Sequence, residues 1–322
     1  DRGNSSFDGT AVDARPDDLD PGQLQAYREL IGSSSPERAL SARNLLTEEG
    51  RLTVAAWLLF AAQPQHLFPS AHVRVLQYAD TERGTGAGMS LLDGRDVRCE
   101  GSIPQQLDEA SALIEDWMPR VQALAASGRF EPRPIIPKDA WLEGLVNAVL
   151  HRSYSLAGDH TRVELFPDRI EISNPGRFPG HADPNHPGTL VRSARNPRIA
   201  RVCADLGNAR ELGEGVLRIF GAMRSAGLTP PVYQQFSSAV RLVLSSARAL
   251  PDETAAALSP GARKILDLMR SAREPLRTGE VETLAGISRP TALRSLRALR
   301  DAGLITWEGE SAREPQARWR LT

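Results

Sequence analysis

Three polar side chains recur at four-residue intervals in an otherwise apolar segment. Glu143, Asn147 and His151 lie in residues 141–151, where the other side chains are hydrophobic or small. At about 100° per residue, this spacing places the three on one face of a helix, within roughly 80° of one another. A carboxylate, an amide and an imidazole on a buried helix need polar partners. A bound polar ligand, a metal ion with its waters, or an internal hydrogen-bond network would each supply them.

Two glycine motifs follow this helix in the chain. Residues 170–176 form a predicted strand that ends in Asn-Pro-Gly, and Gly213-Glu214-Gly215 precedes a predicted helix. Glycines at a helix N-terminus let backbone N–H groups approach an anion, and the helix dipole favours phosphate there. Each glycine motif alone is weak evidence for a phosphate site.

The end of the chain has a different pattern. Three helices are predicted at 262–270, 278–285 and 289–301, followed by strands at 304–307 and 317–321. This order resembles a winged helix-turn-helix, whose third helix enters the major groove of DNA.

The third helix of this unit concentrates positive charge. Residues 286–300 contain four arginines and no acidic residue, while Leu293, Leu296 and Leu299 form its core stripe. The residues expected to contact DNA are Ser288, Arg289, Thr291, Arg294 and Arg297 in this helix, with Arg313 and Arg318 in the wing. A solvated arginine face on a dimerisation wing is the alternative.

The composition is that of a globular protein. The chain has 322 residues, 41% hydrophobic and 25% charged, which excludes collagen-like and wholly disordered classes. Its longest apolar run is too short for a membrane span. The two cysteines, Cys99 and Cys203, fit neither a disulfide framework nor a metal-binding spacing, so a reducing, cytoplasmic location is expected.

Other elements follow from periodicity and from Gly and Pro positions. Helices are predicted at 20–31, 35–46, 53–62, 103–126 (broken or kinked near Pro119), 139–151, 198–206 and 215–226. Strands are predicted at 72–78, 162–166, 169–173, 232–236 and 240–244. Residues 82–94 and 174–196 are predicted loops.

Three segments carry a resemblance to a known family. They are EGLVNAVLHRSY (143–154), DRIEISNPG (168–176) and RNPRIARVCADLGNARELGEGVLRIFGAMRSAGL (195–228). Together they resemble the RecG-related transcriptional regulators, which carry a divergent form of the GHKL ATPase domain of gyrase-type ATPases, chaperones and histidine kinases. The resemblance covers about residues 20–245. It implies an α+β fold, with helices over a mixed sheet in a GHKL-like sandwich.

The resemblance also implies roles for the polar stripe. Glu143 matches the general base that orients an attacking water, and Asn147 matches the amide that completes Mg²⁺ coordination beside the triphosphate. His151 belongs to the same implied nucleotide pocket. ATP and Mg²⁺ are therefore the expected ligands.

The glycine motifs take the remaining implied roles. Asn174 stands where the wider fold uses an aspartate to accept a hydrogen bond from adenine. Gly176 would keep the backbone clear of the base, Gly213 and Gly215 would cradle phosphates, and residues 178–195 would form the lid. The Gly-x-Gly is short and a second threonine box is missing, so ATP binding is expected rather than efficient hydrolysis.

Two other patterns have simpler explanations. His181, Asp183 and His186 could suggest a metal site, but they lack a second ligand pair. Residues 84–88 are rich in glycine, yet no Gly-Lys-Ser/Thr follows them. Without a Walker A sequence the chain cannot be a RecG-type helicase.

The expected organisation has five parts. They are a linker (1–19), an α/β segment (20–130), the GHKL-like domain (131–246), a second linker (247–260) and the winged helix-turn-helix (261–322). An upstream Schlafen-like AlbA module, frequent in the family, is expected to be missing because the chain starts at Asp1.

The predicted function is a DNA-binding transcriptional regulator, of stress-response type, with a nucleotide-sensing domain. Double-stranded DNA, a nucleotide and a second copy of the chain are the expected partners, with no membrane. Two alternatives stay open: an ATPase that couples hydrolysis to conformational change on DNA, and a non-enzymatic interaction scaffold with a degenerate pocket.

Overall fold

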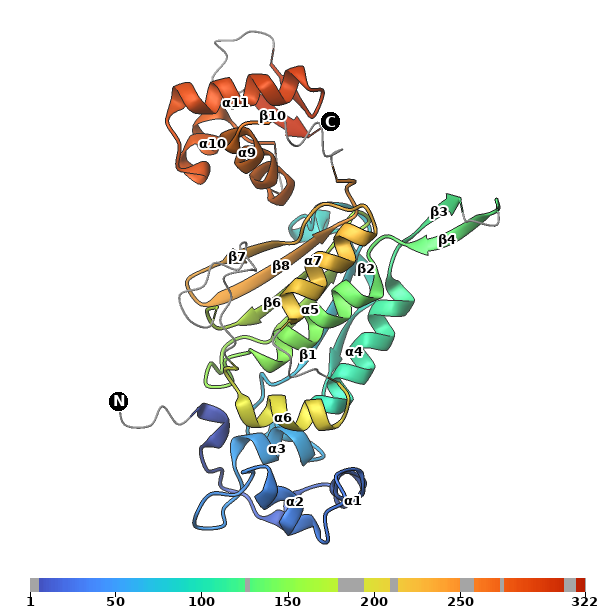
Figure 1. Cartoon of the computed structure of the whole chain (residues 1–322), viewed down its shortest axis with the longest axis vertical. Helices are drawn as coiled ribbons and strands as arrows, with labels where there is room; N and C mark the ends of the chain where they lie inside the picture. Colours follow the sequence, from blue (N-terminus) through green and yellow to red (C-terminus); the bar gives the residue numbers. More distant parts are fainter. Residues whose placement is uncertain are drawn as a thin grey trace. The chain divides into compact units, whose positions relative to one another are not determined.

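A computed structural model describes residues 6–124, 128–178, 194–208, 214–249, 258–272, 275–309 and 317–321 (Figure 1). The chain divides into two compact units, Asp1–Ala247 and Arg248–Thr322. Within the described ranges, no helix combines the length and the apolar character needed to cross a membrane.

A mixed six-stranded sheet, in the order β2–β1–β5–β6–β8–β7, forms the centre of the first unit. Its strands are β1 (Val73–Tyr78), β2 (Leu91–Cys99), β5 (Thr161–Leu165), β6 (Arg169–Pro175), β7 (Val232–Gln235) and β8 (Ala239–Ser245). β1 and β5 run parallel, and all other neighbours in the sheet are antiparallel.

Helices lie over one face of this sheet. The helices of the first unit are α1 (Pro21–Leu30), α2 (Pro36–Ala42), α3 (Val54–Phe60), α4 (Ile103–Trp117), α5 (Lys138–Leu150), α6 (Pro197–Asp205) and α7 (Gly215–Ser225). Figure 1 shows α4, α5 and α7 lying over the sheet. The predicted α+β class, with helices over a mixed sheet, is confirmed.

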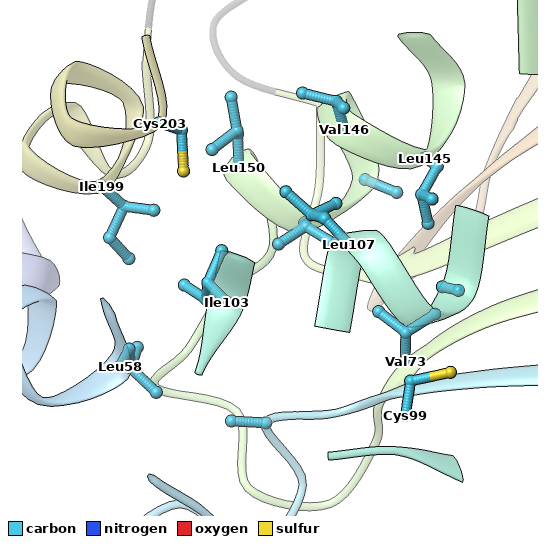
Figure 2. Close-up of a cluster of buried hydrophobic side chains, with 14 of the residues drawn as sticks. Leu58, Val73, Cys99, Ile103, Leu107, Leu145, Val146, Leu150, Ile199 and Cys203 are labelled. Carbon is cyan, nitrogen blue, oxygen red and sulfur yellow. The ribbon is translucent and has the colours of Figure 1, made fainter. Parts of the chain in front are cut away.

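The core lies between the helices and the sheet. Because side chains alternate along a strand, Val73 and Val75 of β1 point into this core, while Leu76 points to the opposite face. Figure 2 shows side chains from α3, α4, α5, α6, β1 and β2 meeting in one cluster. All seven residues of α3 are buried, as its apolar sequence predicts.

The opposite face of the sheet is covered by charged side chains. Glu164 and Glu171, both buried, share the guanidinium of Arg83, and Arg169 donates to Glu171 at 2.9 Å. The hydroxyl of Tyr78 donates to Glu164 at 3.1 Å. Burial raises the pKa of the Glu164 carboxyl, and the charge of Glu171 adds to this, while Arg83 opposes it. These carboxylates are tolerated because each has a positively charged partner.

The N-terminal segment is not the linker that we expected for residues 1–19. Asp8 is fully buried, and its carboxylate accepts hydrogen bonds from the backbone N–H groups of Arg198 (2.8 Å) and Ile199 (3.3 Å). It therefore caps α6 from a distant part of the sequence. The polar, aperiodic sequence from residue 6 onward is held by such contacts, which leave no periodic signal.

The predicted helix 103–126 is wrong in its second half. α4 ends at Trp117, before Pro119, and the chain continues into a separate two-stranded ribbon of β3 (Arg120–Leu124) and β4 (Phe130–Pro134). Figure 1 shows this ribbon projecting from the sheet and its helices. All residues of β4 are exposed, and Phe130 is 72% exposed.

The expected boundary near residue 130, between an α/β segment and the GHKL-like domain, does not separate two sheets. β1 pairs with β5 in parallel and also with β2, so strands from both expected segments form the same sheet. β2 itself, which begins inside the predicted loop 82–94, was missed. The strand begins with an apolar pair, Leu91 and Leu92, but most of its nine residues are exposed.

The second unit has its own apolar core. It contains α9 (Pro260–Ser271), α10 (Thr278–Ala285), α11 (Arg289–Asp301), β9 (Ile305–Glu308) and β10 (Arg318–Leu321). β9 and β10 are antiparallel, and Leu276 forms a single bridge to Trp319 of β10. Of the second expected linker, 247–260, residues 250–257 lie outside the described ranges.

Two imidazoles are stacked at the start of β1 and β5. The rings of His72 and His160 have centroids 4.6 Å apart and an interplanar angle of 21°. Burial, followed by the charge of His72, lowers the pKa of His160 to about 4, and burial also lowers the pKa of His72. The Nε2 atoms of both rings are buried without a hydrogen-bond partner among the described residues.

We expect this pair to make the chain sensitive to acid. The pKa of His160 is lowered from 6.5 to about 4, so the unfolded chain takes up the proton first as the pH falls. The contribution to stability is complete above pH 6.5 and is lost on acidification toward pH 4. His160→Phe keeps a stacked ring without a titrating group, and it should reduce this loss by on the order of 2 kcal/mol.

The measurement is urea unfolding of the full chain at about pH 7.5 and about pH 5, followed by circular dichroism. His66→Gln, at an exposed histidine, is the control and should behave like the wild type. An equal loss of stability in His160→Phe and the wild type would contradict the prediction.

Candidate functional site

Helix α5 approaches the sheet closely because of a glycine. A Cβ on Gly144 would lie 2.8 Å from Cδ2 of Leu242 and 3.0 Å from Cδ1 of Ile172. The face of α5 that carries Gly144 therefore rests directly on β6 and β8. Glu143 and Asn147, one residue before and three after this glycine, are directed toward α7.

The carboxylate of Glu143 is engaged by a residue of α7. Nη2 of Arg218 donates to Oε2 of Glu143 at 2.6 Å, and the two side chains are 28% and 18% exposed. A Cβ on Gly215 would lie 2.2 Å from Oε1 of Glu143 and 3.0 Å from Nδ2 of Asn147. The absence of a side chain at Gly215 therefore allows the first turn of α7 to contact both polar residues of α5.

Tyr233 of β7 also belongs to this surrounding. Its ring is buried and packs edge-on against Phe178, with centroids 5.7 Å apart. Burial raises the pKa of Tyr233, and the negative charge of Glu143 adds to the effect. The charge of Glu143 thus acts on Arg218 of α7 and on Tyr233 of β7.

Hydrogen-bond donors outnumber acceptors around Glu143. Among the described residues, Nδ2 of Asn147 and Nε of Arg218 are both buried without a partner. Glu214, the N-cap residue of α7, makes no side-chain capping hydrogen bond, so among the described residues the first N–H groups of α7 lack that partner. These donors fit an anionic group, and oxygen atoms of Asn147 and Glu143 are of the type that Mg²⁺ binds.

His151 lies one turn beyond Asn147, at the end of α5. Its backbone oxygen accepts a hydrogen bond from Nε of Arg195 at 2.9 Å. Burial lowers the pKa of the His151 ring to about 4, and the charge of Arg195 adds to this. Because of this lowered pKa, the ring is neutral at physiological pH. Nδ1 of His151 is buried without a partner among the described residues.

The turn after β6 is occupied by an arginine. Gly176 has φ +112°, and a Cβ there would lie 3.1 Å from Cβ of Ser153 and 3.3 Å from Cζ of Arg195. The guanidinium of Arg195 thus fills the space in which Gly176 was expected to leave room for a base. Asn174 is half-buried on β6, and Nδ2 of its amide lies 3.5 Å from the backbone oxygen of Pro175.

The structure thus gathers the predicted residues into two groups. Glu143, Asn147 and Gly215 meet between α5 and α7, while Gly176 and His151 are joined through Arg195. Gly213, most of the predicted lid and the residues His181, Asp183 and His186 lie outside the described ranges. Within those ranges, no group of three or more His, Cys, Asp or Glu side chains could hold a metal ion.

Two residues of the site were missed in the sequence. Arg218 was not considered, although a buried carboxylate on α5 requires a positive partner. Asn196 donates from Nδ2 to the backbone oxygens of Leu150 and Arg152, both at 2.8 Å, and so closes the C-terminal end of α5. Its position directly before Pro197, at the start of α6, was the available signal.

The predicted DNA-contacting helix α11 presents arginines to solvent. Arg294 and Arg297 are exposed, and neither makes an ion pair with any residue that the structure describes. Arg289 is also exposed, with a 3.5 Å contact to Glu282. Leu296 and Leu299 are buried and Leu293 is half-buried, so the predicted core stripe is the inner face of α11.

The remaining predicted contacts differ in accessibility. Ser288 begins α11 and is exposed, with its hydroxyl 3.0 Å from that of half-buried Thr291. Arg318 in β10 is half-buried and donates to the backbone oxygen of Pro275 at 3.3 Å. Arg313 lies outside the described residues.

Two parts of the chain match known family models. Residues 158–244 match the family described as "Putative ATP-dependent DNA helicase recG C-terminal", and residues 259–306 match "Bacterial regulatory protein, arsR family". This pair of matches, an ATPase-like domain followed by a helix-turn-helix, confirms the resemblance to RecG-related regulators with a winged helix. The first match begins after α5, so Glu143, Asn147 and His151 lie outside it.

Among solved structures, the chain is similar to the DIP2311 protein from Corynebacterium diphtheriae, with 24% identity and a TM-score of 0.60. The similarity covers 100% of this chain and 65% of that chain, so the present chain spans about two thirds of it. This likeness concerns the fold. No curated protein matches the chain.

The contact between α5 and α7 can be tested with two glycines of the same helix. We expect Gly215→Ala to lower the free energy of unfolding by about 1 to 2 kcal/mol, because its Cβ must displace the Glu143 carboxylate from Arg218. Gly221→Ala is the matched control, since a Cβ there meets nothing within 4 Å. It should raise stability by about 0.5 to 1 kcal/mol through helix propensity. Urea unfolding of the full chain measures both, and a gain in stability for both variants would refute the tight contact.

Proposed function

We propose that this chain is a DNA-binding transcriptional regulator whose first unit binds a purine nucleotide together with Mg²⁺. The observation that carries the DNA-binding part is the outer face of α11, where Arg294 and Arg297 are exposed and have no carboxylate partner among the described residues. Unpaired arginines on the third helix of a helix-turn-helix suit base edges and phosphates.

The nucleotide-binding part is supported by the donors between α5 and α7. Among the described residues, Asn147 and Arg218 each have a buried N–H without a partner, and Glu214 does not cap the first turn of α7 with its side chain. An anionic phosphate would satisfy these donors. Asn147 would then supply an oxygen to Mg²⁺, which when bound neutralises phosphate charge.

Binding fits the site better than rapid hydrolysis does. A general base must be free to accept a proton from water. In the structure the Glu143 carboxylate is held by Arg218 at 2.6 Å. The proposed role of the nucleotide is therefore that of a signal.

The DNA-binding proposal predicts an effect of two arginines. Arg294→Ala should cost about 1 to 3 kcal/mol of binding free energy and relax the preference at one base pair. The double variant Arg294→Ala, Arg297→Ala should lose more. Binding of the full chain to genomic fragments at two salt concentrations measures both.

Lys264→Ala removes one positive charge from an exposed position of α9 and is the control. It should retain sequence preference. Should the double variant bind DNA as tightly as this control does, α11 is not the reading helix and the regulator proposal fails.

The nucleotide proposal predicts that Asn147→Ala abolishes Mg²⁺-dependent ATP affinity, because it removes an oxygen ligand from an ion that tolerates few substitutes. Calorimetry with the full chain, with and without Mg²⁺, measures this. Gln122→Ala, an amide on the exposed ribbon, is the control and should bind as the wild type does. Equal ATP affinity in Asn147→Ala and the wild type would sink the site assignment, and no affinity in either would favour a scaffold.

A further inference from the structure

Arg218 stands between two possible partners. Its Nη2 donates to Glu143 at 2.6 Å, but its Nε is buried and has no partner among the described residues. A guanidinium that makes one bond from its terminal group and none from Nε uses only part of its planar fork. The fork is therefore available for a second group with two oxygens.

The missing group should be an acceptor. Nδ2 of Asn147, next to Gly215, is a second buried donor without a partner, and Glu143 is the acidic side chain that the structure pairs with Arg218. Buried polar groups are normally hydrogen-bonded, and each unsatisfied one costs about 1 to 3 kcal/mol. An additional anion would satisfy Nε of Arg218 and Nδ2 of Asn147, which the carboxylate of Glu143 leaves without a partner among the described residues. Phosphate oxygens match the guanidinium fork.

Charge makes the two partners exclusive. If an anion entered beside Glu143 while Arg218 stayed on the carboxylate, two negative charges would share one positive charge in a partly buried site. Movement of the guanidinium toward the anion would leave the Glu143 carboxylate without its positively charged partner.

We propose that Arg218 is a switch residue that exchanges the carboxylate of Glu143 for the terminal phosphate of the bound nucleotide. This rests on the proposed nucleotide function and extends it to the regulation of the same site. In the unliganded state Arg218 neutralises Glu143 and holds α7 against α5 through Gly215. In the liganded state it binds phosphate, so a nucleotide with a third phosphate is distinguished from one with two.

The exchange predicts opposite effects of the two partners. Glu143→Gln removes the competing charge, so ATP affinity should rise about tenfold. Arg218→Gln removes the phosphate ligand and leaves Glu143 unpaired beside it, so ATP affinity should fall by about tenfold or more, with a smaller loss for ADP. A purely structural ion pair would instead make both variants equally weak, because each breaks the same contact.

Calorimetric titration of the full chain with ATP and with ADP, both with Mg²⁺, tests the exchange. Arg224→Gln, at an exposed arginine in the last turn of the same helix, is the matched control and should bind as the wild type does. Arg218→Lys keeps the charge without the fork and should give an intermediate ATP affinity, which covers the case in which Arg218→Gln does not fold.

The outcomes separate the inference from the function on which it rests. If the wild type binds ATP but Glu143→Gln and Arg218→Gln change its affinity in the same direction or not at all, the switch is overturned and the nucleotide function stands. If neither the wild type nor Glu143→Gln binds any nucleotide while both are folded, the proposed nucleotide function falls, and the switch falls with it.

Discussion

The close approach of α5 to its neighbours, permitted by two glycines, is the constraint on which the first unit depends. Gly144 lets the helix rest on Ile172 and Leu242 of the sheet, and Gly215 lets α7 close against Glu143 from the side. A Cβ at Gly144 would require the side-chain ends of Leu242 and Ile172 to shift, and a Cβ at Gly215 would require the carboxylate of Glu143 to shift, so the present contacts would be lost. The polar face of α5 is therefore covered by α7, and a buried donor on this face is expected to need a hydrogen-bond partner.

Residues 195–198, which begin at the last residue of the predicted lid, connect α5 to the start of the chain. Arg195 and Asn196 bind the backbone at the end of α5, and Arg198 in the next turn pairs with buried Asp8. Residues 195–198 thus contact both the end of α5 and the N-terminal residues, at the start of α6.

The parts that the sequence predicts well are those where local periodicity and packing agree. The four-residue spacing of Glu143 and Asn147 correctly indicates one polar face, because most other residues of α5 from Ala140 onward are buried. Arg218 lies 75 residues away, and its pairing depends on how α7 docks, which no local pattern encodes. The same holds for Asp8, 190 residues from Arg198. The ribbon after Trp117 is exposed throughout β4, so it lacks the apolar alternation by which strands are recognised.

That ribbon also limits how the protein can associate with itself. Pro132 and Pro134 are paired with Gln122 and Arg120, and proline has no N–H. The hydrogen bonds to β3 must then come from the residues between them, and the outer edge of β4 has no donor at Pro132 or Pro134. A strand can be added fully only along β3. Two ribbons joined in this way would present a proline edge on each side, so growth of the sheet would stop at a pair rather than continue into a fibre.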